Sequence, residues 1–224
     1  MLLHLKNVLA PDQLQGAREM LAKLKFVDGK ASAGMAASRV KNNQEANRQA
    51  QEIGDLDNLV VGSLVRHPVY RAGALALKVA TPFYARYVPG MHYGDHEDDP
   101  VMGGEDGLYR TDIAITIFLN DPKAYDGGEL TINTAFGEQK IKLPAGDAVM
   151  YPASSRHRVS EVTRGERLVA VTWVQSLVRD PARRELLYEL NQVRERMLKA
   201  TPEAEDTAHI NAVYVNLVRM WSEL

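Results

Sequence analysis

The chain has 224 residues, of which 45% are apolar and 25% are charged, a composition typical of a globular protein with a sizeable core. Its formal net charge of -2 argues against binding to nucleic acid or to an anionic membrane, so we expect neither partner. The chain has no cysteine, which excludes disulfides, iron–sulfur clusters and zinc–thiolate sites, so a metal must be held by His, Asp or Glu.

The first third of the chain is predicted to form a helical layer. A short strand near residues 2–5 precedes a helix that begins at Pro11, and apolar residues recur at helical spacing up to residue 24. A loop of small residues follows at 29–34, then a polar helix over residues 42–53 and another helix over residues 57–66 that ends before Pro68. Because nothing here is chemically distinctive, we interpret this region as a layer covering one face of a sheet.

Residues 75–175 have the pattern of short strands separated by Gly and Pro turns. We expect strands near residues 76–80, 82–87, 110–119, 126–132, 137–143, 148–152 and 167–175, with a flexible acidic loop at 102–107. Because no helix separates these strands, the pattern favours an antiparallel sandwich or a jelly roll over a parallel sheet.

The periodicity becomes helical again after Asp180-Pro181. Two helices are expected, separated by Thr201-Pro202, and they read as a hairpin attached to the β core. We therefore divide the chain into a domain of residues 1–179 and a helical appendage of residues 180–224. The apolar stripe of these helices can serve a homo-oligomer as easily as the core.

Three residues have the chemistry of a metal site. His96 and Asp98 are separated by one residue, so on an extended segment both side chains leave the same face. A distant second His would complete a 2-His-1-carboxylate site, which suits non-haem Fe(II) and oxygen chemistry. His157, 61 positions after His96 and following a predicted strand and turn, is the best candidate. Glu97, between the first two ligands, should point away from the metal.

Arg167 begins the segment with the strongest strand signal, ten residues after His157. An Arg at the open end of a β core, otherwise surrounded by apolar residues, needs an anion. A dicarboxylate cosubstrate would supply one through a bidentate guanidinium–carboxylate pair.

His96-x-Asp98, His157 and Arg167, in this order and spacing, resemble the signature of the Fe(II)/2-oxoglutarate dioxygenases. The prolyl-4-hydroxylase branch is the most similar in style, because Tyr87 and Tyr93-Gly94 precede the His-x-Asp pair as they do there. Residues 151–159 and 163–170 resemble one subfamily, the bacterial PKHD-type hydroxylases, sometimes called iron-uptake factors. The resemblance runs from about residue 75 to residue 224.

The resemblance implies an α+β fold with a double-stranded β-helix (jelly-roll) core, an N-terminal helical layer and a C-terminal helical hairpin. It implies Fe2+, 2-oxoglutarate and O2 as cofactors, with ascorbate as the reductant. His96, Asp98 and His157 would be the catalytic metal ligands, and Arg167 and Tyr87 would bind 2-oxoglutarate. Related halogenases lack the carboxylate, so the presence of Asp98 favours hydroxylation.

Other functions stay open at this point. The same pocket would suit a non-catalytic iron or 2-oxoglutarate sensor, or a cupin-like metal enzyme without a cosubstrate, although Arg167 argues against the last. A hydroxylase substrate would be a small molecule or a peptide, related to an amino acid, a siderophore or a receptor, with residues 99–108 as its lid. The chain lacks a long apolar run and begins without a signal-peptide pattern, so a cytoplasmic location is expected.

Overall fold

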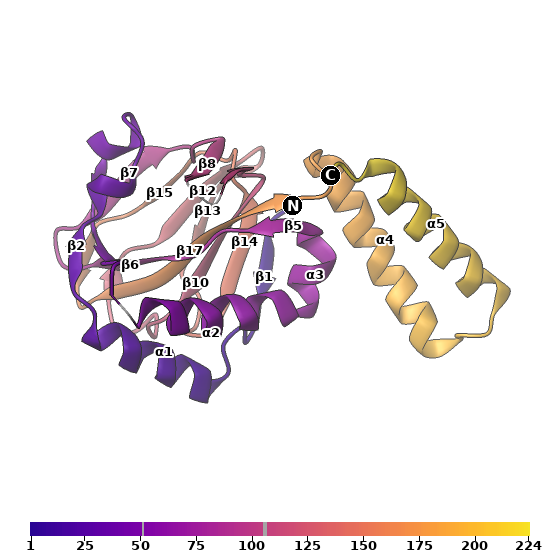
Figure 1. Ribbon diagram of the computed structural model, residues 1–224, viewed down its shortest axis with the longest axis horizontal. Helices are drawn as coiled ribbons and strands as arrows, with labels where there is room; N and C mark the ends of the chain where they lie inside the picture. Colours follow the sequence, from indigo (N-terminus) through magenta and orange to yellow (C-terminus); the bar gives the residue numbers. More distant parts are fainter. Residues whose placement is uncertain (51, 105–106) are drawn as a thin grey trace.

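The computed structural model describes residues 1–50, 52–104 and 107–224. The helices are α1 (Pro11–Lys23), α2 (Ile53–Arg66), α3 (Pro68–Ala74), α4 (Pro181–Ala200) and α5 (Glu205–Trp221), and short 3-10 turns lie at Gly29–Ser32 and Ala37–Arg39. Figure 1 shows a β core, a layer of helices α1 to α3 along one side of it, and the α4–α5 hairpin extending away from the core beyond α3.

Two antiparallel sheets make up the core. The larger has eight strands: β1 (Leu3–Leu5), β14 (Ala148–Pro152), β10 (Ile113–Phe118), β17 (Arg167–Ser176), β6 (Phe83–Tyr87), β4 (Gln44–Ala46) and β2 (Phe26–Asp28) in that order, with β5 (Ala76–Val79) also paired to β17. The smaller has five: β13 (Gly137–Ile141), β12 (Leu130–Thr134), β15 (His157–Val159), β7 (His92–His96) and β3 (Lys41–Asn42). Two-stranded pairs join β11 (Asp126–Gly127) to β16 (Val162–Arg164) and β8 (Val101–Gly104) to β9 (Gly107–Arg110).

Strand β10 shows why an antiparallel strand can be a continuous apolar run. It pairs with β14 on one side and with β17 on the other, and all six of its residues are buried. Ile113, Ile115 and Ile117 pack under the helical layer, whereas Ala114 and Phe118 face the space between the two sheets. Both faces of the strand are therefore covered, and the usual alternation of polar and apolar residues disappears.

The helical layer forms because α1 and α2 each present an apolar stripe to the large sheet. Leu14, Ala17 and Leu21 of α1 and Leu56, Val60 and Leu64 of α2 are buried in one cluster with the isoleucines of β10. This confirms the α+β jelly-roll architecture with its N-terminal helical layer, and it leaves the other face of the large sheet free to line a site.

Two sequence predictions are wrong. The expected polar helix over residues 42–53 is replaced in its first part by β3 and β4, because Gln44 pairs with Arg86 of β6. Of the expected flexible loop at 102–107, residues 102–104 and 107 instead belong to the paired strands β8 and β9, in which Met102 pairs with Tyr109. Gln51, in the predicted helix, and Glu105 and Asp106, in the predicted loop, lie outside the described residues.

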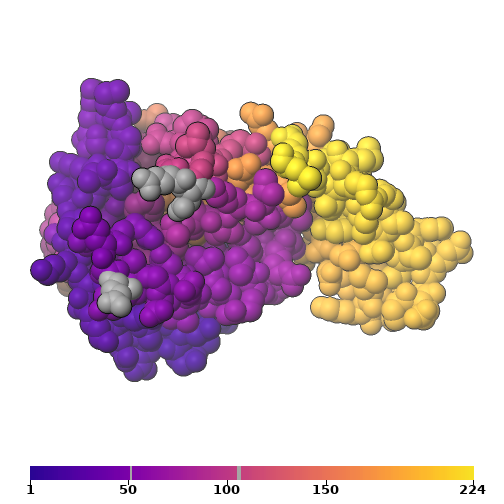
Figure 2. Space-filling model, viewed as in Figure 1, coloured from indigo at the N-terminus to yellow at the C-terminus, as the bar shows by residue number. Residues whose placement is uncertain are grey.

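The C-terminal hairpin that the sequence predicts is present as α4 and α5. In Figure 2 these helices, orange and yellow, stand out from the rest of the molecule. The first turns of α4 attach it to the core: Leu187 is fully buried, and Arg184 donates to the carbonyl oxygens of Val178 and Arg179. None of the helices in the described part of the chain has the length and apolar character needed to cross a bilayer.

Candidate active site

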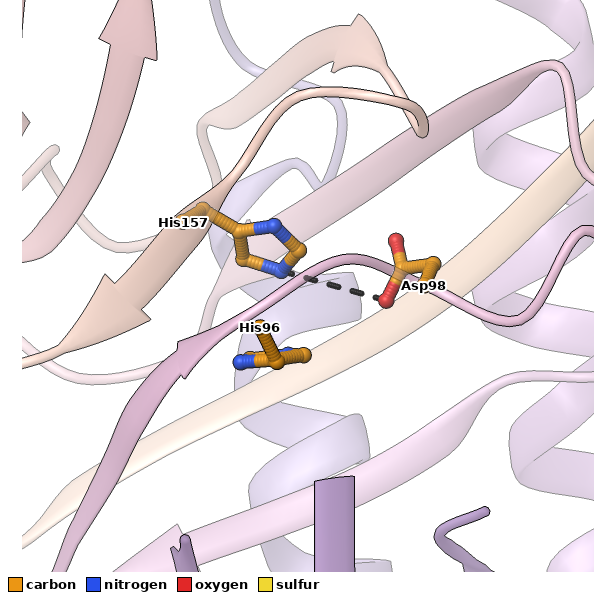
Figure 3. Close-up of side chains that lie close together, drawn as sticks. All are labelled: His96, Asp98 and His157. Atoms are coloured by element: carbon orange, nitrogen blue, oxygen red, sulfur yellow. Dashed lines mark ion pairs between the residues drawn. The ribbon is translucent and has the colours of Figure 1, made fainter. Parts of the chain in front are cut away.

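His96, Asp98 and His157 come together between the two sheets, as predicted. His96 ends β7 and pairs directly with His157 of β15, while Asp98 lies two residues beyond the end of β7 (Figure 3). One ligand atom from each side chain lies within 4.8 Å of the others, and Asp98 Oδ1 is 3.8 Å from His157 Nε2. Within the described residues this is the one group of three or more such side chains that could hold a metal ion.

Backbone carbonyls orient both imidazoles. His96 Nδ1 lies 2.8 Å from the carbonyl oxygen of Gly94, and His157 Nδ1 lies 2.9 Å from that of Ser155. Because a carbonyl oxygen only accepts hydrogen bonds, each Nδ1 carries the proton and each Nε2 keeps a free lone pair for a metal. Burial, reinforced by the neighbouring His157, lowers the pKa of His96 to about 4, so this ligand is neutral at physiological pH.

Trp173 holds the carboxylate ligand, a role that the sequence analysis did not assign to it. Its indole Nε1 donates to Asp98 Oδ2 at 2.9 Å, which leaves Oδ1 on the side of His157. Burial raises the pKa of Asp98, whereas His157 and the indole donor act in the opposite direction. Trp173 shares a strand face with Arg167, since they are six residues apart on β17, and this spacing was the available signal.

Tyr93 supports the other end of the triad. Its ring stacks on that of His96 with centroids 3.6 Å apart and an interplanar angle of 12°. On Tyr93 lies the Lys41 ammonium, with Nζ 5.3 Å from the ring centroid. The position of His96 is therefore fixed by a hydrogen bond and by a stacked ring.

A pocket of about 100 Å³ connects the triad to Arg167. This volume is several times the roughly 10–15 Å³ that a single water needs, so the pocket has room for a small ligand. Arg167 is only 2% exposed, its Nε has no hydrogen-bond partner, and it makes no ion pair with any described residue. A buried guanidinium in this state needs an anion, and the carboxylate of a dicarboxylic acid fits that need.

Tyr87, the predicted second contact for 2-oxoglutarate, lies beside Arg167. The two residues are cross-strand partners on β6 and β17, and the guanidinium carbon is 4.9 Å from the tyrosine ring centroid. Burial raises the pKa of Tyr87, and Arg167 and a hydrogen bond from Asn43 lower it in part. The phenol therefore stays protonated, as a donor to an anion must.

One wall of the pocket comes from the region that seemed chemically plain. Lys41 of β3, Asn43 between the strands and Glu45 of β4 are every second residue, and all three are buried facing the pocket. Lys41 Nζ bonds Glu45 Oε1 at 2.5 Å and Ser32 Oγ at 2.8 Å. The period of two was a strand signal, but it was hidden because the inward residues are polar.

Other residues near the triad differ in whether they reach the pocket. His92 is half-buried on β7 and is not among the residues that line the pocket, and Arg110 is paired with Asp112. Glu97 is exposed and lies at the pocket, as does Asp99, so the mouth is acidic. Met102 of the β8–β9 hairpin also lines the pocket.

Comparison with known proteins adds two family matches. Residues 82–175 match the 2OG-Fe(II) oxygenase superfamily, and residues 181–223 match the PKHD-type hydroxylase C-terminal domain. A PKHD-type hydroxylase of Thioalkalivibrio sulfidiphilus is 52% identical over 224 residues, covering 100% of both chains. The PKHD-type hydroxylase YbiX of Escherichia coli is 39% identical over 225 residues, again covering 100% of both chains.

Solved structures with the same fold are more distant in sequence. A Pseudomonas putida prolyl-4-hydroxylase has a TM-score of 0.52 and 19% identity, covering 78% of this chain and 92% of its own. A Trichoplax adhaerens prolyl hydroxylase has a TM-score of 0.55 and 15% identity, with 78% and 83% covered. With an imidazole–carboxylate–imidazole group in the pocket and a full-length relative at 52% identity, the chain belongs to the PKHD-type hydroxylases of the 2OG-Fe(II) oxygenase superfamily, and it is a 2-oxoglutarate-dependent dioxygenase that uses iron.

Proposed function

We propose that this dioxygenase is a hydroxylase that couples oxidative decarboxylation of 2-oxoglutarate to hydroxylation of a C–H bond in a polar substrate. His96, Asp98 and His157 bind Fe(II) on one side of the pocket. Arg167 and Tyr87 bind the far carboxylate of 2-oxoglutarate. The observation that carries these assignments is the buried, unpaired Arg167 in the same pocket as the triad.

Iron with 2-oxoglutarate and O2 supplies the oxidising power, and the protein supplies position and charge. Arg167 neutralises one carboxylate in a buried site, where the pairing is much stronger than in water. Trp173 keeps Asp98 in one rotamer, and Tyr93 does the same for the ring of His96. Apolar residues Leu130, Val159 and Val171 line the same pocket and keep bulk water out.

The substrate enters on the side of residues 32–45 and the β8–β9 hairpin, and residues 99–108 act as its lid. This wall offers Ser32 and the Lys41–Glu45 pair as hydrogen-bonding groups, and Glu97 and Asp99 at the mouth are both acidic. Such a lining suits a peptide or an amino-acid-like molecule better than an apolar one. A related fold, the Trichoplax prolyl hydroxylase, was solved with a peptide fragment.

The test is an anaerobic titration of the iron-loaded protein with 2-oxoglutarate, followed by the visible charge-transfer band that this chelate gives. Wild type is compared with His157→Ala, Arg167→Ala and, as a matched control, Arg164→Ala, because Arg164 lies close in sequence but is exposed and pairs with Asp126. We expect the band in wild type and in the control. His157→Ala should lose it, and Arg167→Ala should need at least about tenfold more 2-oxoglutarate.

The absence of a band in folded, iron-bound wild type would contradict the proposal and favour a cupin-like enzyme. Succinate release in air then separates a hydroxylase from an iron or 2-oxoglutarate sensor, which would bind both but turn over neither. The link to iron uptake, the cytoplasmic location and the division at residues 179 and 180 stay predictions. Growth of a strain lacking the gene under iron limitation would check the first.

A further inference from the structure

The helices α4 and α5 contact each other through a seam that includes several polar groups. Arg194 of α4 donates to Asn211 of α5 at 2.8 Å and to Asn191 at 2.7 Å, and its guanidinium lies 4.7 Å from the Tyr214 ring centroid. Thr207, 1% exposed, lies on the same side of α5. By the same helical spacing, Leu187 and Leu198 of α4 and Val218 and Trp221 of α5 lie on this side, so the seam combines polar and apolar side chains.

A second set of apolar residues lies one position earlier than the seam in each helix. On α4 they are Leu186, Leu190, Val193 and Met197, and on α5 they are Ile210, Val213, Leu217 and Met220. Steps of three and four residues align each set as a stripe. A position one residue earlier in an α-helix is rotated by about 100° around the helix axis. Because the helices run in opposite directions, these rotations turn both stripes to the same face of the hairpin.

The seam also sets the register of this face. Arg194 opposite Asn211 places Val193 beside Val213, with one layer beyond them towards the loop and two towards the core. The four layers are Leu186 with Met220, Leu190 with Leu217, Val193 with Val213, and Met197 with Ile210. We call these eight residues the hairpin face.

Nothing in the described part of the chain covers the hairpin face. Leu186 is 61% exposed, Val193 39%, Val213 50% and Met220 73%, and the other four members are half-buried. Neither of the two hydrophobic clusters among the described residues contains a residue of α4 or α5. The hairpin projects from the body of the molecule (Figure 2). A contiguous exposed apolar surface of this kind marks an interaction site.

We propose that the hairpin face packs against the hairpin face of a second copy of this chain, so that two hairpins form a four-helix bundle. A two-fold axis parallel to the helices places α4 of one copy antiparallel on α5 of the other, with the four layers in register. The flanking charges then complement each other. Glu189 of one copy lies on the same edge of the bundle as Arg219 of the other.

Charge also separates this partner from a membrane surface. Residues 181–224 contain six Lys or Arg and seven Asp or Glu, a net charge of -1. Helices that lie on anionic bilayers are rich in Lys and Arg along their polar face, which this hairpin is not. A self-complementary apolar face with mixed flanking charges fits a symmetric protein interface instead.

The test compares full-length wild type with Val193→Glu and Val213→Glu, which place a charge in the central layer. The matched control is Val215→Glu: Val215 is 40% exposed on the same helix but lies on the opposite side of the seam. Light scattering after size exclusion and sedimentation velocity give the mass, and circular dichroism with thermal unfolding checks the fold. The same proteins are mixed with phosphatidylglycerol/phosphatidylcholine vesicles in a flotation assay.

We expect wild type and the Val215→Glu control at twice the chain mass of 24.9 kDa. The two central variants should be folded monomers, with a dimer dissociation constant raised at least about 100-fold, because each buries an unpaired carboxylate. A monomeric wild type, a dimer that survives both central substitutions, or equal loss in the control would each overturn the proposal. So would a monomeric wild type that floats with vesicles, which would assign the face to lipid.

Discussion

At the residue scale, the active site depends on side chains that do not themselves bind the metal. Trp173 fixes Asp98, Tyr93 stacks on His96, and Asn43 bonds Tyr87. Each partner limits the rotamers of a functional group before any ligand arrives. The free-energy cost of ordering those groups is therefore met during folding and not during binding.

Trp173→Phe isolates the indole hydrogen bond, since the ring stays apolar and the donor to Asp98 is lost. We expect iron affinity to fall about tenfold or more, because groups that orient metal ligands typically contribute 10–100-fold. Competition with a metal-sensitive dye measures it. The other tryptophan provides the control: Trp221→Phe, on α5, should leave the affinity unchanged. Equal affinities for wild type and Trp173→Phe would contradict the assigned role.

The metal ligands could be predicted from sequence because their constraint is local and chemical. The spacing of His96 and Asp98 indicates a metal site, and a chain with six His residues offers few choices for the third ligand. Trp173 and Lys41 could not be predicted in the same way, since their roles follow from which strands become neighbours. Lys41 can be buried because it forms an ion pair with Glu45. A pattern of apolar residues in the sequence does not predict a buried ion pair.

At the element scale, the turn between β11 and β12 controls Arg167. Gly128 has a positive φ of 66°, and a Cβ there would lie 3.0 Å from Arg167 Cδ and 3.1 Å from Tyr125 Cε2. The turn therefore combines a backbone conformation that favours glycine with a close approach to the cosubstrate residue. Strands β3 and β4 were predicted as a helix, because they are short and their inward-facing residues are polar.

Gly128→Ala should weaken 2-oxoglutarate binding about tenfold, because Arg167 must move to make room. Gly137→Ala is the matched control: its φ is also positive, 104°, but a Cβ there meets nothing within 4 Å. Both variants should lose about 1–3 kcal/mol of stability from backbone strain. Anaerobic titration and urea unfolding measure the two effects. The same 2-oxoglutarate affinity in both variants would show that the contact with Arg167 is unimportant.

At the scale of the whole molecule, the body and the hairpin share few buried groups. A chain that ends at residue 179 loses the burial of Leu187 and the two hydrogen bonds of Arg184. We expect this truncation to cost about 2–5 kcal/mol of unfolding free energy, measured with urea. The 2-oxoglutarate titration should change little, because every pocket residue lies between positions 32 and 173. Loss of that binding in a folded truncation would contradict the proposed division.

Strand β17 is the last strand of the chain, yet it lies between β10 and β6 in the large sheet. Before it is synthesised, β1, β14 and β10 share no strand with β6, β4 and β2, and two long edges stay open to other chains. Arg167 and Trp173 arrive on the same strand, so the cosubstrate site and the support of Asp98 form only when the sheet closes. Strand pairing between residues far apart in the sequence forms slowly. We therefore expect nascent chains that have not yet reached residue 167 to be the most prone to aggregation and the most dependent on chaperones.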